Sequence, residues 1–136
     1  MTRPRLASIS PSFIVSDLDS TIAFYRDKLG FEVRFREADA PWFAVIGREG
    51  AQLFIKSEGG IKPVPNHTRH RHLRLDAFIY VADPEALADE FAAKGVSFST
   101  PFNKNTSDGL TGFELADPDG YILFFGCPTS EVKPGP

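Results

Sequence analysis

The stretch that decides the fold is residues 115–125, LADPDGYILFF. Its centre, Asp117-Pro118-Asp119-Gly120, has the composition of a tight turn. Pro118 presets the φ angle of the first central position, the aspartates can bond to nearby backbone groups, and Gly120 adopts a left-handed conformation at low cost. Apolar runs flank the turn on both sides. The stretch therefore predicts a β-hairpin near the end of the chain.

An earlier stretch, residues 42–55, repeats this pattern with the turn-like sequence GREG between two apolar runs. Each hairpin follows a strand-like run, a helix-like segment and a glycine. The helix-like segments match in length, because Asp17 and Gly30 are 13 positions apart and Asp83 and Gly95 are 12 apart. This self-similarity predicts an internal duplication of a strand–helix–strand–hairpin unit.

The duplication predicts an α+β fold with two βαβββ modules that form a curved mixed sheet. One face of the sheet is expected to carry the helices, and the other to form a concave ligand cleft. We expect the first module to span residues 6–57 and the second residues 73–128. A linker loop over residues 58–72 joins them, and a flexible Pro- and Gly-rich tail covers residues 129–136.

Local signals give the ends of the elements. The first helix is expected to begin at Ser16 or Asp17 and to end before Gly30, and its apolar stripe contains Tyr25. Residues 31–36 alternate apolar and charged side chains, which predicts a half-exposed strand with a single apolar face. Three further strands are expected over residues 9–15, 74–81 and 96–101.

Composition excludes several classes of protein. The chain has 136 residues, a net charge of −3 and a pI near 5.6, so general attraction to nucleic acid is not expected. Its one cysteine, Cys127, is expected to be a small hydrophobic residue. No run reaches the roughly 18 apolar residues of a membrane span, and no signal-like apolar core begins the chain. A soluble cytoplasmic protein is expected.

Two motifs carry a resemblance to a known family. Residues 23–31 read AFYRDKLGF after VSDL at residues 15–18, and residues 117–121 read DPDGY. With these motifs at these places, the chain resembles the vicinal oxygen chelate superfamily over residues 8–128. The superfamily includes glyoxalase I, extradiol dioxygenases, fosfomycin resistance enzymes and bleomycin resistance proteins. Its members isomerise, cleave rings, open epoxides or only bind, so the fold does not decide the function.

The resemblance implies where a metal would be held. The positions that match the superfamily's ligands are Ser10, Gln52, Asp76 and Phe124. A catalytic divalent site needs about three protein ligands, and this set has one hydroxyl, one apolar ring and a single carboxylate. The expectation is therefore a protein without a metal or other cofactor. A weak Mg²⁺ site on Asp76 and Gln52 stays open as an alternative.

Strand alternation extends the cleft, because side chains two apart share a face. The expected ligand-binding residues are aromatic or polar and include two acids, and they suit a planar aromatic ligand or a cationic one. The alternative is that the aromatics form core or dimer contacts. The expected set is Ser10, Ser12, Gln52, Phe54, Asp76, Phe78, Glu114 and Phe124, with Ile14, Tyr80 and Ile122 on the same face.

The ending FELADPDGYILFFG, residues 113–126, is similar to the bleomycin-resistance group. That resemblance implies a metal-free homodimer that confers antibiotic resistance by sequestering a small molecule, in clefts within one chain or across two. A metal-dependent lyase, isomerase or dioxygenase is the first alternative. An interaction module whose aromatics close the cleft is the second.

The three histidines, His67, His70 and His72, lie among the arginines of the expected linker. His70 and His72 have the spacing of two ligands on one strand face, but the neighbouring positive charges disfavour a cation there. A solvated basic loop is the favoured interpretation. The functional alternative is a flap that attracts anions over the cleft.

Overall fold

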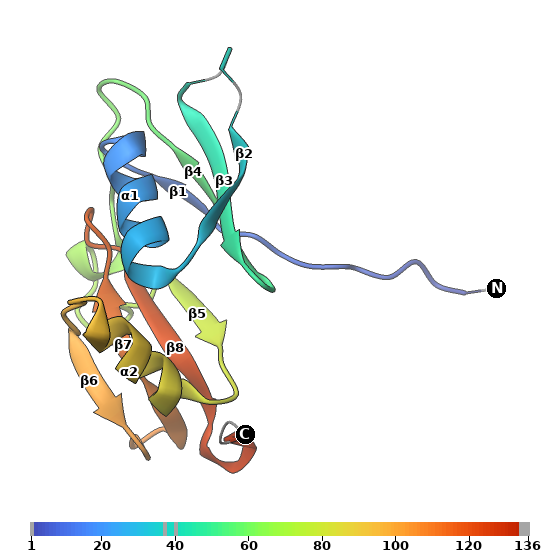
Figure 1. Cartoon of the computed structure of the whole chain (residues 1–136), viewed down its shortest axis with the longest axis vertical. Helices are drawn as coiled ribbons and strands as arrows, with labels where there is room; N and C mark the ends of the chain where they lie inside the picture. Colours follow the sequence, from blue (N-terminus) through green and yellow to red (C-terminus); the bar gives the residue numbers. More distant parts are fainter. Residues whose placement is uncertain (1, 37, 40, 134–136) are drawn as a thin grey trace.

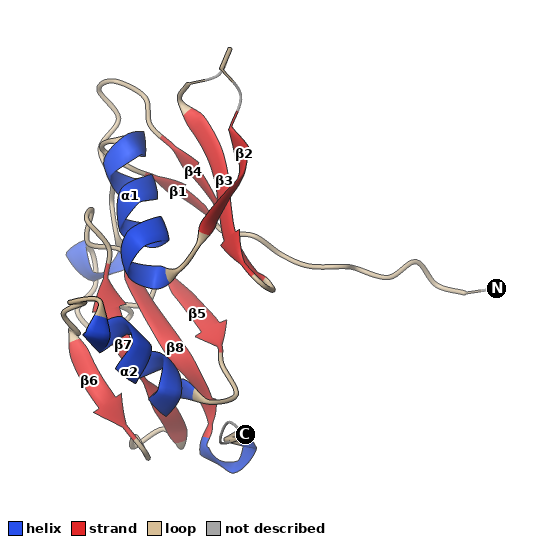
Figure 2. Cartoon of the chain, in the orientation of Figure 1, coloured by secondary structure: helices blue, strands red, loops and turns tan. Residues whose placement is uncertain are grey.

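The computed structural model describes residues 2–36, 38–39 and 41–133. This part of the chain contains two α-helices and eight β-strands, which form two four-stranded sheets (Figures 1 and 2). Each sheet has its own helix. The α+β class and the two-module architecture expected from the sequence are confirmed.

The first module consists of β1 (Ser12–Ile14), α1 (Leu18–Leu29), β2 (Glu32–Arg36), β3 (Phe43–Arg48) and β4 (Ala51–Lys56). Its strands lie in the order β1-β4-β3-β2. The β1–β4 pair is parallel and the other pairs are antiparallel, so the sheet is mixed.

The second module repeats this plan with β5 (Ala77–Tyr80), α2 (Pro84–Ala93), β6 (Thr100–Asn103), β7 (Leu110–Ala116) and β8 (Ile122–Pro128). Its order, β5-β8-β7-β6, and its single parallel pair, β5–β8, match those of the first module. The predicted duplication is therefore confirmed at the level of topology.

Polar caps fix both helix starts. The Asp17 carboxylate accepts a hydrogen bond from the backbone N–H of Ser20 at 2.9 Å, and Asp83 accepts one from Ala86 at 3.2 Å. These bonds satisfy backbone donors that have no partner inside the helix. Gly30 ends α1 with a φ of 75°, a left-handed conformation that favours glycine. The helix boundaries predicted from these residues are confirmed.

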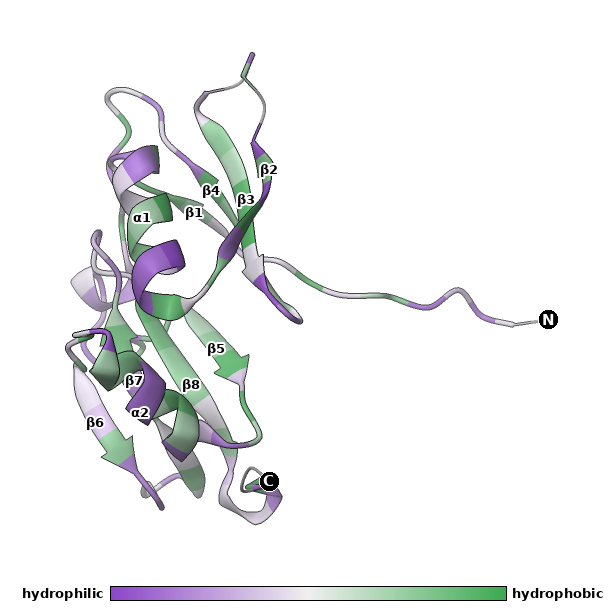
Figure 3. Cartoon of the chain, viewed as in Figure 1, coloured by the Kyte–Doolittle hydropathy of each residue, from purple (hydrophilic) through white to green (hydrophobic). Residues whose placement is uncertain are grey.

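A single hydrophobic core joins the two modules. Tyr25 and Leu29 of α1 and Phe91 of α2 are 0% exposed, and they belong to one buried cluster with side chains from both sheets. Figure 3 shows hydrophobic residues along β3 and β8, and hydrophilic bands on the outward surfaces of the helices. The two sheets contribute alternate residues to this cluster, namely Phe13, Val15, Leu53, Ile55, Leu123 and Phe125, with Ile79 and Val81 packed against it.

The predicted Asp-Pro-Asp-Gly turn also holds the modules together. One oxygen of Asp117 accepts hydrogen bonds from the backbone N–H groups of Asp119 and Tyr121, at 2.9 and 3.0 Å. Its other oxygen accepts a hydrogen bond from the Tyr25 hydroxyl of α1 at 2.9 Å. Burial raises the pKa of Asp117 from its ordinary value of 3.8 to about 6, against the lowering effect of these donors.

Further contacts cross the same junction. The ring of Tyr121 stacks on Phe13 with centroids 4.3 Å apart, and its hydroxyl donates to the backbone carbonyl of Ile14 at 2.5 Å. On the other side of the helices, the Arg48 guanidinium forms a bidentate pair with Glu90, at 2.7 and 3.0 Å. The modules are thus joined at two separate places.

Three expected strands begin later or are shorter than the sequence indicated. Instead of residues 9–15, β1 covers only Ser12–Ile14, because Pro11 lies at the start of the pairing and contributes only its carbonyl, which accepts from Phe54 at 2.9 Å. Instead of residues 74–81, β5 covers Ala77–Tyr80. Instead of residues 96–101, β6 covers Thr100–Asn103.

The alternation expected over residues 31–36 is wrong beyond Val33. The pairing of β2 with β3 shifts between Val33 and Phe35, which is a β-bulge at Arg34. A bulge adds one residue to one strand and so reverses the face of every residue that follows it. Phe35 therefore lies on the face away from α1, whereas Arg36 turns to the helix side and pairs with Asp19 of α1 at 2.7 Å.

Both ends of the chain extend beyond the modules. Before β1, the chain runs away from the body as an extended arm, with Leu6 99% and Ile9 91% exposed (Figure 1). After β8, the expected tail begins with a short 3-10 helix over Thr129–Glu131, and residues 134–136 lie outside the described part. Neither helix of the described chain is long and apolar enough to cross a membrane.

Candidate functional site

Each sheet presents one face to the helices and leaves the other open. We call the side of the first module's sheet that faces away from α1 the first open face. The side of the second module's sheet that faces away from α2 is the second open face. Strand register places Ser12 and Phe54 on the first open face and Phe78, Glu114 and Phe124 on the second. These side chains alternate with core residues, as the sequence predicted.

A chain of polar side chains crosses one end of the first open face. The Gln52 amide donates to the Ser10 hydroxyl at 3.2 Å, and its carbonyl oxygen accepts from the Arg34 guanidinium at 3.4 Å. Arg34 also donates to the backbone carbonyl of Glu49 at 2.8 Å. We call Ser10, Gln52 and Arg34 the polar row.

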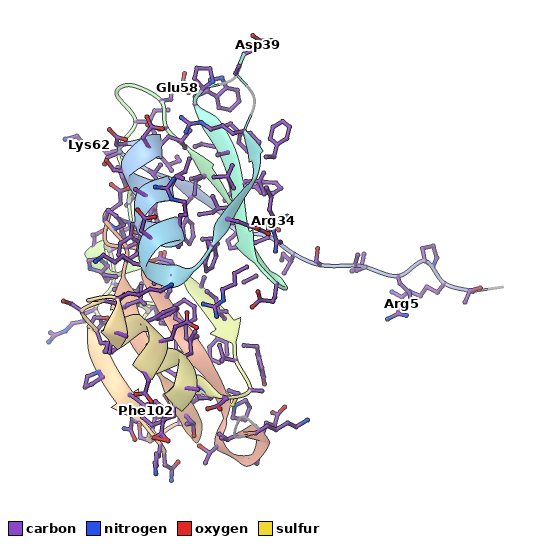
Figure 4. The ribbon with its side chains drawn as sticks, viewed as in Figure 1. Arg5, Arg34, Asp39, Glu58, Lys62 and Phe102 are labelled. Atoms are coloured by element: carbon purple, nitrogen blue, oxygen red, sulfur yellow. The ribbon has the colours of Figure 1, made fainter. Side chains whose placement is uncertain are left out.

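Sequence reasoning missed Arg34, because the bulge that places it on this face is not visible in the residue pattern. The signal that could have found it is Gly47 on the neighbouring strand. A Cβ atom at Gly47 would lie 2.6 Å from the guanidinium carbon of Arg34, so the guanidinium lies where a side chain would otherwise stand. Figure 4 labels Arg34 beside β3, on the side of the sheet opposite α1.

Aromatic side chains form a group next to the polar row on the first open face. Phe43 lies between Phe35 and Phe54, with ring centroids 6.0 and 5.8 Å away. Trp42 continues the group at 5.9 Å from Phe43. Phe35 is 47% exposed and Trp42 is 51% exposed. The face therefore combines a polar end with a broad aromatic surface.

The second open face is more uniformly aromatic. Phe78 stacks on Phe124 at 5.1 Å and contacts Tyr80 at 5.5 Å. The Phe124 ring lies over two glycines, because a Cβ atom at Gly112 or Gly126 would stand 2.8 or 2.6 Å from it. Phe124 is consequently 7% exposed, whereas Phe78 is 39% exposed.

The two carboxylates expected in the cleft are already engaged. Asp76 accepts hydrogen bonds from the backbone N–H groups of Asn66 and Ile122, at 2.9 and 2.8 Å, one on each oxygen. Glu114 pairs with Arg74 at 3.1 Å and accepts from the hydroxyl of Thr100. Both acids therefore fix the protein's own structure: Arg74 neutralises Glu114, and each oxygen of Asp76 has a backbone N–H partner.

A groove of about 470 Å³ lies between the end of the β3–β4 hairpin and β5. Gln52 of the first face and Phe78 and Tyr80 of the second face border it, and Leu87 and Phe91 form part of its apolar lining. Of the eight expected ligand-binding residues, this groove brings together Gln52 and Phe78. The other six do not line it: Ser10, Ser12, Phe54, Asp76, Glu114 and Phe124.

The four positions that match the superfamily's metal ligands do not fit a divalent ion. Ser10 and Gln52 are bonded to each other beside the positive charge of Arg34, both oxygens of Asp76 hold backbone donors, and Phe124 has no donor atom. Within the described ranges, no group of three or more His, Cys, Asp or Glu residues is arranged to hold a metal.

The segment between the two sheets is mostly exposed and contains a short 3-10 helix over Asn66–Thr68. His67, His70 and His72 are all exposed, and His67 lies 2.9 Å from the backbone carbonyl of Gly120. A shallow hollow of about 600 Å³ is bordered by Arg69, His70, His72 and Arg74. The loop thus contacts the turn of the second hairpin, and none of its residues is among those that line the groove beside β5.

Comparison with known families agrees with this geometry. Residues 5–125 match the model of the Glyoxalase/Bleomycin resistance protein/Dioxygenase superfamily. The chain belongs to this superfamily. The match includes both modules, so the resemblance inferred from the two motifs is confirmed.

Solved structures of the superfamily share the fold. A bleomycin-binding protein from Streptomyces verticillus, in complex with copper(II)-bleomycin, has a TM-score of 0.68 at 24% identity and covers 92% of this chain and 98% of its own. Another bleomycin-binding protein, in complex with bleomycin, has a TM-score of 0.67 at 22% identity and covers 90% and 98%. At this identity the likeness shows the fold alone.

A curated relative is a metal-dependent enzyme, unlike the bleomycin-binding proteins. An iron-dependent extradiol dioxygenase from Rhodococcus jostii is 24% identical over 127 residues. The match covers 87% of this chain but only 42% of the relative's length. The superfamily therefore supplies both metal-dependent and ligand-binding relatives, and only the site can favour one of them.

Proposed function

We propose that this protein is a metal-independent small-molecule-binding protein of the bleomycin-resistance type, which acts by sequestering its ligand in the cytoplasm. One observation carries the proposal. The four positions that would hold a metal in this superfamily are occupied by side chains whose donor atoms are engaged inside the protein or are missing. A site without free donors cannot polarise a substrate through an ion, whereas its aromatic surfaces can still bind one.

The open faces suit a planar ligand. Phe54, Phe43 and Phe35 on the first face and Phe78 and Tyr80 on the second present rings at stacking distances from one another. Burying an aromatic surface between such rings gains about 25 cal/mol per Å² and an additional 0.5–1.5 kcal/mol for each well-placed ring pair. Each open face thus has rings on which a planar ligand can stack.

We propose further that the protein is a homodimer. The arm before β1 leaves Leu6 and Ile9 almost fully exposed, which is costly for a monomer in water. β5 is an edge strand, and the groove beside it has an apolar lining. Pairing of the arm with the corresponding groove of a second copy would cover both features. Removal of residues 2–10 should convert the dimer into a monomer, measured by light scattering.

The binding function is tested by ligand-induced stabilisation. A library of planar aromatic compounds is screened for increases in melting temperature, with and without a chelator. We expect compounds that raise the melting temperature equally under both conditions, because a ligand that binds only the folded state stabilises it by mass action. The absence of any stabilising compound would contradict the proposal.

Two variants make this screen specific. Phe54→Ala removes a ring from the first open face, and Ile61→Ala removes a side chain of the linker that is 47% exposed and lies outside both faces. We expect the first variant to lose most of the ligand-induced shift and the second to keep it. Equal loss in both variants would mean that the compounds bind elsewhere.

The second candidate function is metal-dependent ring cleavage, and the similarity to the extradiol dioxygenase favours it. It is tested by adding Fe²⁺ anaerobically, then oxygen and a catechol, and following the loss of the catechol. Turnover that a chelator abolishes would support ring cleavage. Our proposal requires that no turnover occurs.

A further inference from the structure

We infer that the first open face binds an aromatic oxyanion, in which a carboxylate or a sulfonate is joined to a planar ring system. The inference rests on the proposed binding function and specifies its ligand class. It departs from the cationic ligand that the resemblance to bleomycin resistance proteins implies. Its basis is the distribution of charge around the aromatic side chains.

Positive side chains lie on both sides of the central aromatic row of the first open face. In that row, β-pairing aligns Phe35 with Val45 and Val45 with Phe54. The polar row with Arg34 lies on one side of it. On the other side, Lys56 is aligned with Phe43 and occupies the same open face by strand alternation.

Few negative charges oppose these cations. Glu32 comes within 4.0 Å of Arg34, but its side chain is 76% exposed, so the pair is weak. Among the described residues, Lys56 takes part in no ion pair within 4.0 Å. Glu49 lies in the turn after β3 and is directed at Arg48, at 3.3 Å, and Arg48 is on the helix side of the sheet, where it also pairs with Glu90. On the described part of the first open face itself, Arg34 and Lys56 are opposed by Glu32 alone, so it carries a net positive charge in a protein whose net charge is −3.

The Arg34 guanidinium is held in a defined position. Its donors to the Glu49 carbonyl and to Gln52 fix it against β3, and its side chain is 29% exposed. A guanidinium held in this way loses little freedom when it binds an oxyanion, and its fork of N–H groups matches two oxygens. The Ser10 hydroxyl and the Gln52 amide lie next to it in the polar row and carry further hydrogen-bond donors.

The carboxylates at the centre of the second open face are engaged within the protein. Glu114 is paired with Arg74, and both Asp76 oxygens hold backbone N–H groups. Glu131 accepts from the Tyr80 hydroxyl at the far end of this face, at 3.4 Å. A cationic ligand would thus meet aromatic rings and, beside Tyr80, the carboxylate of Glu131 at the edge of the face.

The test uses three ligands of one shape and different charge, measured by isothermal titration calorimetry. They are 2-naphthoate, the neutral 2-naphthamide and the cationic 2-naphthylmethylammonium. We expect naphthoate to bind at least about ten-fold more tightly than the other two, which corresponds to one charge-assisted interaction. Its affinity should fall as the salt concentration rises.

Matched variants locate the interaction. Arg34→Gln should raise the Kd for naphthoate about ten-fold and leave that for naphthamide within about two-fold. Arg36→Gln removes the same charge from the same strand but on the helix side, where Arg36 pairs with Asp19, so it should change the Kd by less than about two-fold.

A third variant moves the guanidinium without removing it. Gly47→Ala places a methyl group 2.6 Å from the Arg34 guanidinium carbon, and the end of a flexible side chain can give way while the fold is kept. We expect weaker naphthoate binding at an unchanged net charge. This result separates a positioned guanidinium from a general positive field.

Several results would overturn the inference. Equal binding of the three ligands, tighter binding of the ammonium compound, or equal effects of Arg34→Gln and Arg36→Gln would each do so while leaving the broader binding function intact. No binding of any of the three would also overturn it. The broader function then depends on the library screen, which fails or succeeds independently.

Discussion

The two modules have the same topology, and they differ in the side chains on their open faces. Both have the strand order of a parallel pair followed by two antiparallel pairs, and both helices begin at a capping aspartate. On the open face of each module, one large side chain covers a glycine of a neighbouring strand. In the first module it is the guanidinium of Arg34 over Gly47, and in the second the ring of Phe124 over Gly112.

This difference teaches where a duplicated fold can change. The helix side of each sheet contributes to one common core, so substitutions there affect both halves together. The open side is not part of this common core. There, a glycine leaves room for a large side chain of a neighbouring strand, and that side chain differs between the two modules. The first module has become polar and positive at one end, and the second has become aromatic.

The largest expected effects come from the common core. Ile55 on β4 and Phe125 on β8 occupy corresponding positions, opposite Phe13 and Ile79 on the parallel partner strands. Phe125→Ala should reduce the free energy of unfolding by about 3–5 kcal/mol and Ile55→Ala by about 2–5 kcal/mol. Urea denaturation checks both values.

Because the core is continuous, each variant should unfold in one transition. Circular dichroism follows both modules, whereas the fluorescence of Trp42, the only tryptophan, follows the first. The two signals should coincide. Separate transitions would break the comparison, since the modules would then be independent units.

The junction between the modules should respond to pH. The raised pKa of Asp117, about 6, means that the folded protein keeps a proton that the unfolded chain releases near pH 4. Stability conferred by this group is therefore present below about pH 4, falls by up to roughly 3 kcal/mol as the pH rises to about 6, and is level above that.

Asp117→Asn isolates this contribution. The difference in free energy of unfolding between the wild type and the variant should change between about pH 4 and pH 6. Ser107→Ala, in an exposed loop, changes no titratable group, so it is the control and should show a constant difference. If both differences were constant, Asp117 would not be a buried acid in solution.

A smaller effect is expected from the second contact between the modules. Arg48 lowers the pKa of Glu90 by a direct hydrogen bond, and the two side chains are 27% and 38% exposed. After allowance for solvent screening, a double-mutant cycle with Arg48→Gln and Glu90→Gln should give a coupling of about 0.5–1 kcal/mol. A coupling near zero would leave the Asp117 turn as the main link.

The smallest effect on stability is expected on the open faces. Phe35→Ala removes a ring that is 47% exposed, so the free energy of unfolding should change by only about 0.5 kcal/mol. Ligand-induced stabilisation should fall markedly in the same variant. A large loss of stability would show that Phe35 belongs to a core or dimer contact.

The helix caps, the duplication and the core faces could be predicted because each depends on short-range chemistry. Asp17, Gly30 and Asp83 act on backbone groups within a few residues, and strand alternation alone divides core from open face. The Asp-Pro-Asp-Gly turn was predictable as a turn, but its bond to Tyr25 was not, because the partner lies 92 positions away.

The candidate site was less predictable for the same reason. The bulge at Arg34 depends on how β2 pairs with β3, and no residue type in β2 encodes it. Asp76 and Glu114 were expected to face a ligand, yet their hydrogen-bond partners come from other segments. The charge that each open face presents thus depends on strand pairing and on which charged groups have partners. Neither can be read from the residue types alone.

The most direct test of the central claim is the metal content of the protein. The purified protein is incubated separately with Fe²⁺, Mn²⁺, Ni²⁺ and Zn²⁺, passed through a desalting column and analysed by inductively coupled plasma mass spectrometry. We predict far less than one metal ion per chain in every case, with ligand binding unchanged. One tightly held ion per chain, lost on substitution of Gln52 or Asp76, would contradict the proposal.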